Sequence, residues 1–283
     1  MTKNIAIIDE TFDINITSSY HLAIQVSSKG VCFAILDTVR VKFIAFKNIW
    51  FGENLEDESL FDKLDALFLT EGYLNRNYRH LFFNFICRKA TLIPAPIYVD
   101  DDKESYLDFI DSSSDSEIVL SKLIPGVDAF LVYSMPEKVY QLANHHLDDP
   151  SFFHQASPFI ENAIISSKGK SSANRVFIQI NSNFADLLVI EGGTLKLYNT
   201  FSFKTLKDLI FYILYIYDQF RLPTQQTPLR LSGYFTSELL DQLGRYIRRI
   251  EYEEFNRSFT YSYTFNELEQ HSYTNLINMF RCE

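Results

Sequence analysis

The residues best suited to chemistry lie in two short polar turns. Ser28 lies in the first turn, and Asn181, Ser182 and Asn183 form the second. Hydroxyl, amide and turn N–H groups can bind phosphate oxygens. These residues, together with Gly233 after a later apolar run, are therefore candidates for a vestigial nucleotide-binding cleft. The same residue types are common in solvent-facing hairpin turns, and we favour that simpler interpretation.

Other residues suggest a site by type but lack the necessary spacing. His145 and His146 are adjacent on a predicted helix and point in different directions, and neither they nor His154 belong to an HExxH motif. The acidic run at residues 100–102 lacks the glycine of a calcium-binding loop. Neither a GxSxG motif nor a GxxxxGK phosphate loop occurs. We therefore predict no catalytic residue, no metal site and no cofactor.

The composition is that of a globular protein. The 283 residues carry a net charge of −10, whereas nucleic-acid binding depends largely on Lys and Arg. The first ten residues lack a secretory signal, and the longest apolar run, residues 209–217, is too short to cross a bilayer. Cys32, Cys87 and Cys282 are odd in number and far apart, which indicates neither a disulfide framework nor a zinc site. We expect a cytoplasmic protein that binds no nucleic acid and does not insert into a membrane; the sequence leaves its oligomeric state open.

The elements that would position the polar turns form an internal repeat. Residues 22–37 align without a gap with residues 176–191, which places Gln25 on Gln179. In each copy two apolar runs flank a polar turn, a pattern typical of a β-hairpin. A third strand, a helix and a further strand follow, at about 40–46, 59–72 and 80–87 in the first copy and at about 194–200, 206–220 and 229–232 in the second. The repeated unit is therefore βββαβ.

Capping signals mark the helices of both copies. Ser59 with Asp62, and Thr205 with Asp208, have the spacing of capping boxes. Residues 206–220 are apolar nearly all round. Such a helix is expected to lie between a sheet and a second layer.

A small, polar stretch at residues 166–172 divides the two copies and suits a crossing loop. We assign residues 1–168 to a first lobe with an N-terminal extension. Residues 169–283 form the second lobe, which we expect to end in a C-terminal helix capped by Thr264 and Glu267.

This duplicated βββαβα plan resembles the actin-like ATPases, an α/β class with a ribonuclease H-like fold. The chain is more specifically similar to an uncharacterised Bacteroidetes family, the domain of unknown function 3822. Four short segments carry that similarity: 91–94 (TLIP), 154–160 (HQASPFI), 231–233 (LSG) and 282–283 (CE). A more distant resemblance links the chain to actin-like scaffold domains of pilus-assembly and secretion systems.

The resemblance implies a degraded cleft. In active members of the superfamily, an Asp at the end of each lobe's first strand holds Mg²⁺ or positions water, and turn glycines let the backbone approach phosphate. The matching residues here are Gln25 and Gln179, followed by Ser27 and Asn181. A neutral amide does not supply the negative charge that a hard cation needs. Gly233 stands alone where active members have paired glycines.

We therefore expect a non-catalytic interaction or scaffold protein that binds a protein partner. The fold would be retained as a rigid support, while the abundant aromatic residues could form an interface. Phe152, Phe153, Tyr234 and Phe235 are candidates for exposed anchors.

An alternative is an ATP-binding protein or phosphotransferase with atypical cleft residues. Asp37, Asp186 or Glu191 would then supply the missing carboxylate. A nuclease of the ribonuclease H type would need a carboxylate cluster that begins on the first strand, and Gln25 and Gln179 argue against it.

Overall fold

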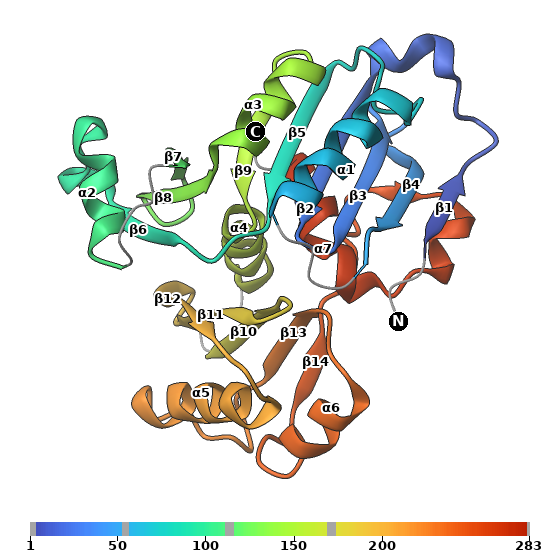
Figure 1. Ribbon diagram of the computed structural model, residues 1–283. Helices are drawn as coiled ribbons and strands as arrows, with labels where there is room; N and C mark the ends of the chain where they lie inside the picture. Colours follow the sequence, from blue (N-terminus) through green and yellow to red (C-terminus); the bar gives the residue numbers. More distant parts are fainter. Residues whose placement is uncertain (1–3, 53–56, 111–115, 169–173, 282–283) are drawn as a thin grey trace.

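The chain forms two lobes, each built on a mixed β-sheet with helices on its faces (Figure 1). The computed structural model describes residues 4–52, 57–110, 116–168 and 174–281. Most of the expected crossing loop and the 282–283 ending lie outside the described residues.

The first sheet has the strand order β1-β4-β3-β2-β5-β9, and β15 pairs with β4. Its strands are β1 (Ile5–Ile8), β2 (Tyr20–Ser27), β3 (Gly30–Asp37), β4 (Lys42–Trp50), β5 (His80–Phe85), β9 (Ser151–His154) and β15 (Thr260–Tyr261). The second sheet has the order β12-β11-β10-β13-β14. Its strands are β10 (Arg175–Ile180), β11 (Phe184–Glu191), β12 (Thr194–Ser202), β13 (Leu229–Gly233) and β14 (Ile250–Tyr252).

The two sheets repeat one plan. In each, an antiparallel hairpin (β2–β3 or β10–β11) is extended by a third antiparallel strand on one side. On the other side, two parallel strands follow, β5 and β9 in the first sheet and β13 and β14 in the second. The predicted βββαβ repeat is therefore confirmed. Parallel pairing requires a crossover, and α1 and α5 supply it in the two lobes.

Helices cover the faces of both sheets. They are α1 (Asp57–Thr70), α2 (Lys103–Asp108), α3 (Glu137–His146), α4 (Ala156–Ser167), α5 (Leu206–Gln219), α6 (Ser237–Leu243) and α7 (Gln270–Asn278). Short 3₁₀ turns are η1 (Ile14–Ser19), η2 (Ala95–Ile97), η3 (Asp100–Asp102), η4 (Tyr263–Glu267) and η5 (Met279–Arg281). The largest apolar cluster includes Leu64 of α1 and Ile160 of α4, and it reaches Phe177 and Leu188 of the second sheet. Helix α4 thus ties the two lobes into one core.

A third, small sheet is inserted into the first lobe, in the order β6-β8-β7. Its strands are β6 (Ala90–Pro94), β7 (Glu117–Ile124) and β8 (Ala129–Pro136), and α2 packs against it. None of these strands belongs to the repeated βββαβ unit that the sequence predicts.

The C-terminal part of the chain returns to the first lobe. Strand β15 pairs with β4, and Phe255, Phe265 and Leu276 join a cluster on the first sheet that contains Phe43. Helix α7 also packs against β13, so it contacts both lobes. The division at residue 168 stays a prediction, because residues 169–173 lie outside the described part of the chain.

Three local predictions were wrong. Ser59 lies inside α1, which already includes Asp57, so it is not an N-cap. The C-terminal helix does not start at Thr264, because Leu268 has an extended backbone that separates η4 from α7. Helix α5 is not covered on both sides: it packs on the second sheet, but Phe211 on its outer face is 61% exposed.

Candidate functional site

The two polar turns lie at the ends of equivalent hairpins. In the second turn Asn181 is buried, whereas Ser182 and Asn183 are exposed. In the first turn Ser28 is exposed, and the neighbouring Lys29 lies with its Nζ 5.8 Å from the centre of the Trp50 ring. No hydrogen bond joins Ser28 to the second turn among the described residues.

Gln25 and Gln179, the residues expected to stand where active actin-like ATPases carry acids, are buried and hydrogen-bonded to neighbouring strands. Asn84 of β5 donates its Nδ2 to Gln25 Oε1 at 3.2 Å. In the second lobe, Ser232 of β13 donates its hydroxyl to Gln179 Oε1 at 2.5 Å. Each amide therefore joins its hairpin to the adjacent parallel strand, and these internal partners occupy its oxygen.

Gly233 is needed for the close approach of two backbone segments. Its φ of +85° lies in the region that favours glycine, and a Cβ there would overlap with the carbonyl oxygen of Ile180. The adjacent Tyr234 N–H donates to that same carbonyl at 3.1 Å. Packing alone thus accounts for the glycine. Gly233 and Asn181 are brought together around Ile180, whereas Ser28 lies on the other hairpin.

Asp186 lies directly opposite Gln179 in the hairpin ladder and is fully buried. Its carboxylate accepts four side-chain hydrogen bonds, from Thr200 (2.7 Å), Tyr198 (3.1 Å), Gln155 (3.3 Å) and Asn181 (3.3 Å). Burial raises the pKa of the carboxyl to about 6, although the four donors oppose the shift. Asp186 is therefore an internal carboxylate with a complete set of partners.

Gln155, which the sequence analysis missed, connects this carboxylate to the first lobe. Its Nε2 donates to the carbonyl of Cys87, just beyond β5, and to Asp186; its Oε1 accepts from the Cys87 N–H at 3.2 Å. His154 bonds the same carbonyl at 3.0 Å, and burial lowers the pKa of His154 to about 3, so the ring is neutral at pH 7. Gln155 belongs to the segment 154–160 that carries the family resemblance, but the sequence gives it no role, since its partners lie far away along the chain.

A pair of tyrosines lies where the second lobe meets the first hairpin. The rings of Tyr234 and Tyr273 are 6.2 Å apart in an edge-to-face arrangement. Tyr234 is 42% exposed as a whole, but burial around its hydroxyl raises its pKa well above the ordinary value. Burial raises the pKa of Tyr273 to about 12, and the nearby Cys32 thiol adds to both shifts. Cys32 is the ladder partner of Gln25. The tyrosine pair thus lies close to the Gln25–Cys32 pair of the first hairpin.

The other two acids suggested as replacements lie at the wrong ends of their hairpins. Asp37 pairs with Tyr20 at the start of β2, and its carboxylate accepts from the N–H groups of the following turn. Glu191 pairs with Thr194 beside the β11–β12 turn.

The prediction that Phe153 is an exposed anchor is also wrong, because its side chain is buried in the core.

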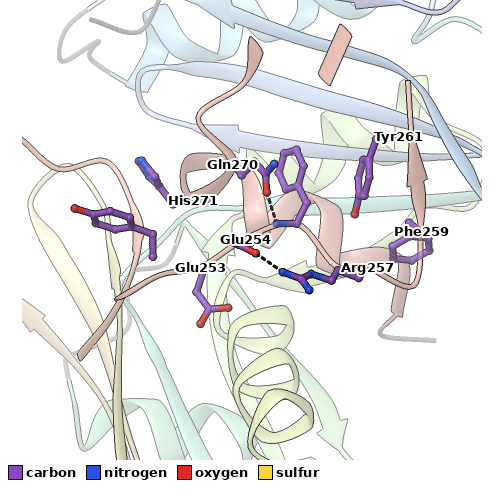
Figure 2. Close-up of a pocket in the computed structure, with 9 residues that line it drawn as sticks. Glu253, Glu254, Arg257, Phe259, Tyr261, Gln270 and His271 are labelled. Carbon is purple, nitrogen blue, oxygen red and sulfur yellow. Dashed lines mark hydrogen bonds and ion pairs between the residues drawn. The ribbon is translucent and has the colours of Figure 1, made fainter. Parts of the chain in front are cut away.

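Neither of two cavities in the described part of the chain is lined by a residue of the polar turns. The larger, about 570 Å³, lies on the segment that returns from the second lobe to the first (Figure 2). Figure 2 shows Glu254 paired with Arg257, and Gln270 accepting a bond from the Phe255 N–H. The smaller, about 150 Å³, is lined by residues that include Arg88, Tyr198 and Thr200, beside Asp186.

No group of three or more His, Cys, Asp or Glu side chains is arranged to hold a metal ion within the described ranges. His146, one of the adjacent histidines, bonds Asp65 at 2.7 Å and stacks on Phe68. In the same part of the chain, no helix has the length and apolar character needed to cross a membrane.

Comparisons with known proteins agree with this architecture. A family model described as a protein of unknown function, DUF3822, matches residues 9–250. A crystal structure from Bacteroides thetaiotaomicron, of a protein with an actin-like ATPase fold and unknown function, has a TM-score of 0.81 and 19% identity over 96% of this chain and 100% of that one. No curated protein sequence matches the chain.

Two more distant structures share the fold. A chain of the PilM–PilN type IV pilus biogenesis complex has a TM-score of 0.59 and 10% identity, over 93% of this chain and 98% of that one. The ethanolamine utilization protein EutJ from Carboxydothermus hydrogenoformans has a TM-score of 0.52 and 7% identity, over 97% and 92%. At these identities the likeness concerns the actin-like ATPase fold alone.

Proposed function

Because this chain belongs to the DUF3822 family of unknown function and has the actin-like ATPase fold, we propose that it is a non-catalytic scaffold that binds a protein partner. The family and the fold are those that the sequence resembles. The PilM–PilN complex supports the proposal by analogy, since it contains a protein of this fold in an assembly with another protein.

The observation that carries the proposal is the internal bonding of the cleft residues. Metal-assisted phosphoryl transfer needs a carboxylate that is free to hold Mg²⁺ or to position water. Gln25 and Gln179 offer amides whose oxygens already accept bonds from Asn84 and Ser232. Asp186 is buried beneath four donors, so coordinating a metal would first require breaking that network.

The tyrosine pair adds a steric argument. Tyr234 follows Gly233 directly, and its hydroxyl lies near Cys32 of the first hairpin. A ligand that entered beside Cys32 would have to separate the rings of Tyr234 and Tyr273, which favours a scaffold role over nucleotide turnover.

Thermal unfolding with ATP and Mg²⁺ tests the non-catalytic part. A ligand present at 100 times its dissociation constant stabilises a protein by about 2.7 kcal/mol, which raises its Tm by several degrees. We expect no shift at millimolar nucleotide and no phosphate release. A saturable shift accompanied by turnover, both lost in Asp186→Asn, would overturn the proposal.

The partner-binding part needs a separate experiment. Affinity purification of the tagged chain from cells that express it should recover one other protein in a stoichiometric amount, and the recombinant pair should form a complex of defined mass. Recovery of the chain by itself, across several growth conditions, would contradict this part without affecting the first.

One observation favours the alternative of a phosphate-binding protein. Arg88 and Lys89 line the smaller cavity with Tyr198 and Thr200, two of the residues that donate to Asp186. Lys89 is already paired with Glu117 at 3.3 Å, which weakens its attraction for an anion. A thermal shift with inorganic phosphate that is lost in Lys89→Met would favour this alternative.

A further inference from the structure

Helix α5 presents an aromatic face that none of the other described elements covers. Phe211 is 61% exposed and Tyr215 is 45% exposed, and their rings stack with centres 6.0 Å apart. The opposite face, which includes Leu209 and Ile213, is buried against the second sheet. Figure 1 shows α5 on the side of the second lobe that points away from the first lobe. Exposed aromatic pairs of this kind often mark protein interfaces.

Charged side chains of opposite sign flank the aromatic pair on the same face. Lys207 lies one turn before Phe211, and Asp218 lies about one turn after Tyr215; both are exposed. Neither side chain has an ion-pair partner among the residues that the structure describes. Their positions also oppose the helix dipole, which favours acids near the N-terminus and bases near the C-terminus. Stabilisation of α5 itself therefore does not explain these two charges.

We propose that this face binds the same face of a second copy of the chain, with the two α5 helices antiparallel. A twofold axis midway between residues 207 and 218 would place Lys207 of each copy opposite Asp218 of the other. The 11-residue separation corresponds to about 16 Å along the helix, and Phe211 and Tyr215 of both copies fill the space between the two ion pairs. An isologous contact of this kind is self-complementary by symmetry.

The contact would be modest in size. Stable interfaces bury roughly 1,200–2,000 Å² in total, and one pair of helices, each about 21 Å long, supplies less than that. The dimer is therefore expected to dissociate on dilution. The antiparallel arrangement also sets each helix dipole against the opposite dipole of its neighbour, which is the favourable orientation.

Sedimentation velocity over a hundredfold range of protein concentration tests the proposal. The unmodified protein should shift from monomer towards dimer as concentration rises. Phe211→Glu should remain monomeric throughout, because it places two carboxylates in the apolar centre. Leu69→Glu is the matched control, since Leu69 is 63% exposed on α1, and it should dimerise as the unmodified protein does. Thermal unfolding of both variants verifies that they are folded.

Charge reversal identifies the antiparallel pairing. Lys207→Asp and Asp218→Lys each replace two attractive pairs by two repulsive ones, so each should raise the dissociation constant by about tenfold. The double variant restores opposite charges and should return to within about threefold of the unmodified protein. A monomer at every concentration, or a dimer that tolerates Phe211→Glu, would overturn the proposal. A double variant as weak as the two single variants would also overturn it.

Discussion

The Asp186→Asn variant is expected to change how the stability of the protein depends on pH. In the folded protein, burial raises the pKa of the Asp186 carboxyl from its ordinary value of 3.8 to about 6. In the unfolded chain the carboxyl regains its ordinary pKa. Because the folded state has the higher pKa, it binds a proton that the unfolded state has lost, and this contribution to stability disappears as pH rises through about 6.

The size of the effect follows from the two pKa values. A carboxyl that titrates near 3.8 when unfolded and near 6 when folded lowers the free energy of unfolding by about 2 kcal/mol between pH 4 and pH 7.5. Asparagine has no such proton. The variant also turns an amide N–H₂ towards groups that already donate, which costs a roughly constant 1–3 kcal/mol. The stability advantage of the wild type should therefore shrink by about 2 kcal/mol as pH rises from 4 to 7.5.

Urea unfolding at the two pH values measures this difference. Far-UV circular dichroism and the fluorescence of Trp50, the single tryptophan, provide two probes of the transition. Asp241→Asn is a matched control, because Asp241 is an exposed acid on α6 and the same substitution there removes no buried carboxyl. If the difference between the wild type and Asp186→Asn is constant with pH, or grows as pH rises, the description of Asp186 as a buried acid is refuted.

Three further substitutions test other parts of the structure by chemical denaturation. Gly233→Ala should lower the free energy of unfolding by about 2–4 kcal/mol, because it adds a left-handed residue and an overlap with Ile180; an unchanged stability would contradict the packing role of this glycine. Thr205→Ala should cost about 1 kcal/mol through loss of the capping box with Asp208, and Thr205→Ser should retain most of it. Leu64→Ala should cost about 2–5 kcal/mol by opening a cavity between α1 and the first sheet, and a loss below 1 kcal/mol would show that the site collapses around the smaller side chain.

The repeated unit could be predicted because its signals are local. A β-hairpin needs only two apolar runs and a turn between them, and both copies have these within about 16 residues of sequence. The capping box of Thr205 and Asp208 is likewise contained in four residues, and the structure has it as expected. The internal alignment also placed Gln25 on Gln179, and in the structure both side chains join the hairpin to the next parallel strand.

The rest depends on contacts between distant segments. Gln155 bonds Cys87 and Asp186, which lie 68 and 31 positions away along the chain. The neighbouring residues in the sequence therefore do not indicate the role of Gln155. Helix α5 shows a different limit. Its apolar and aromatic composition predicts a helix that is covered on both sides. Composition does not reveal whether the second covering surface would come from the same chain or from another one. The position of Asp186 beneath four donors was also not predictable, since three of those donors are ordinary polar residues of turns and strands.

The return of the chain to its first sheet also affects biosynthesis. The N–H of Thr260 bonds the carbonyl of Val41, 219 positions earlier, and the aromatic face around Phe43 and Phe46 is closed only by residues near the end of the described chain. While the ribosome is still making the second lobe, that face has no cover. The nascent first lobe must therefore remain incomplete for most of translation, which is the period when exposed apolar surface invites aggregation or chaperone binding.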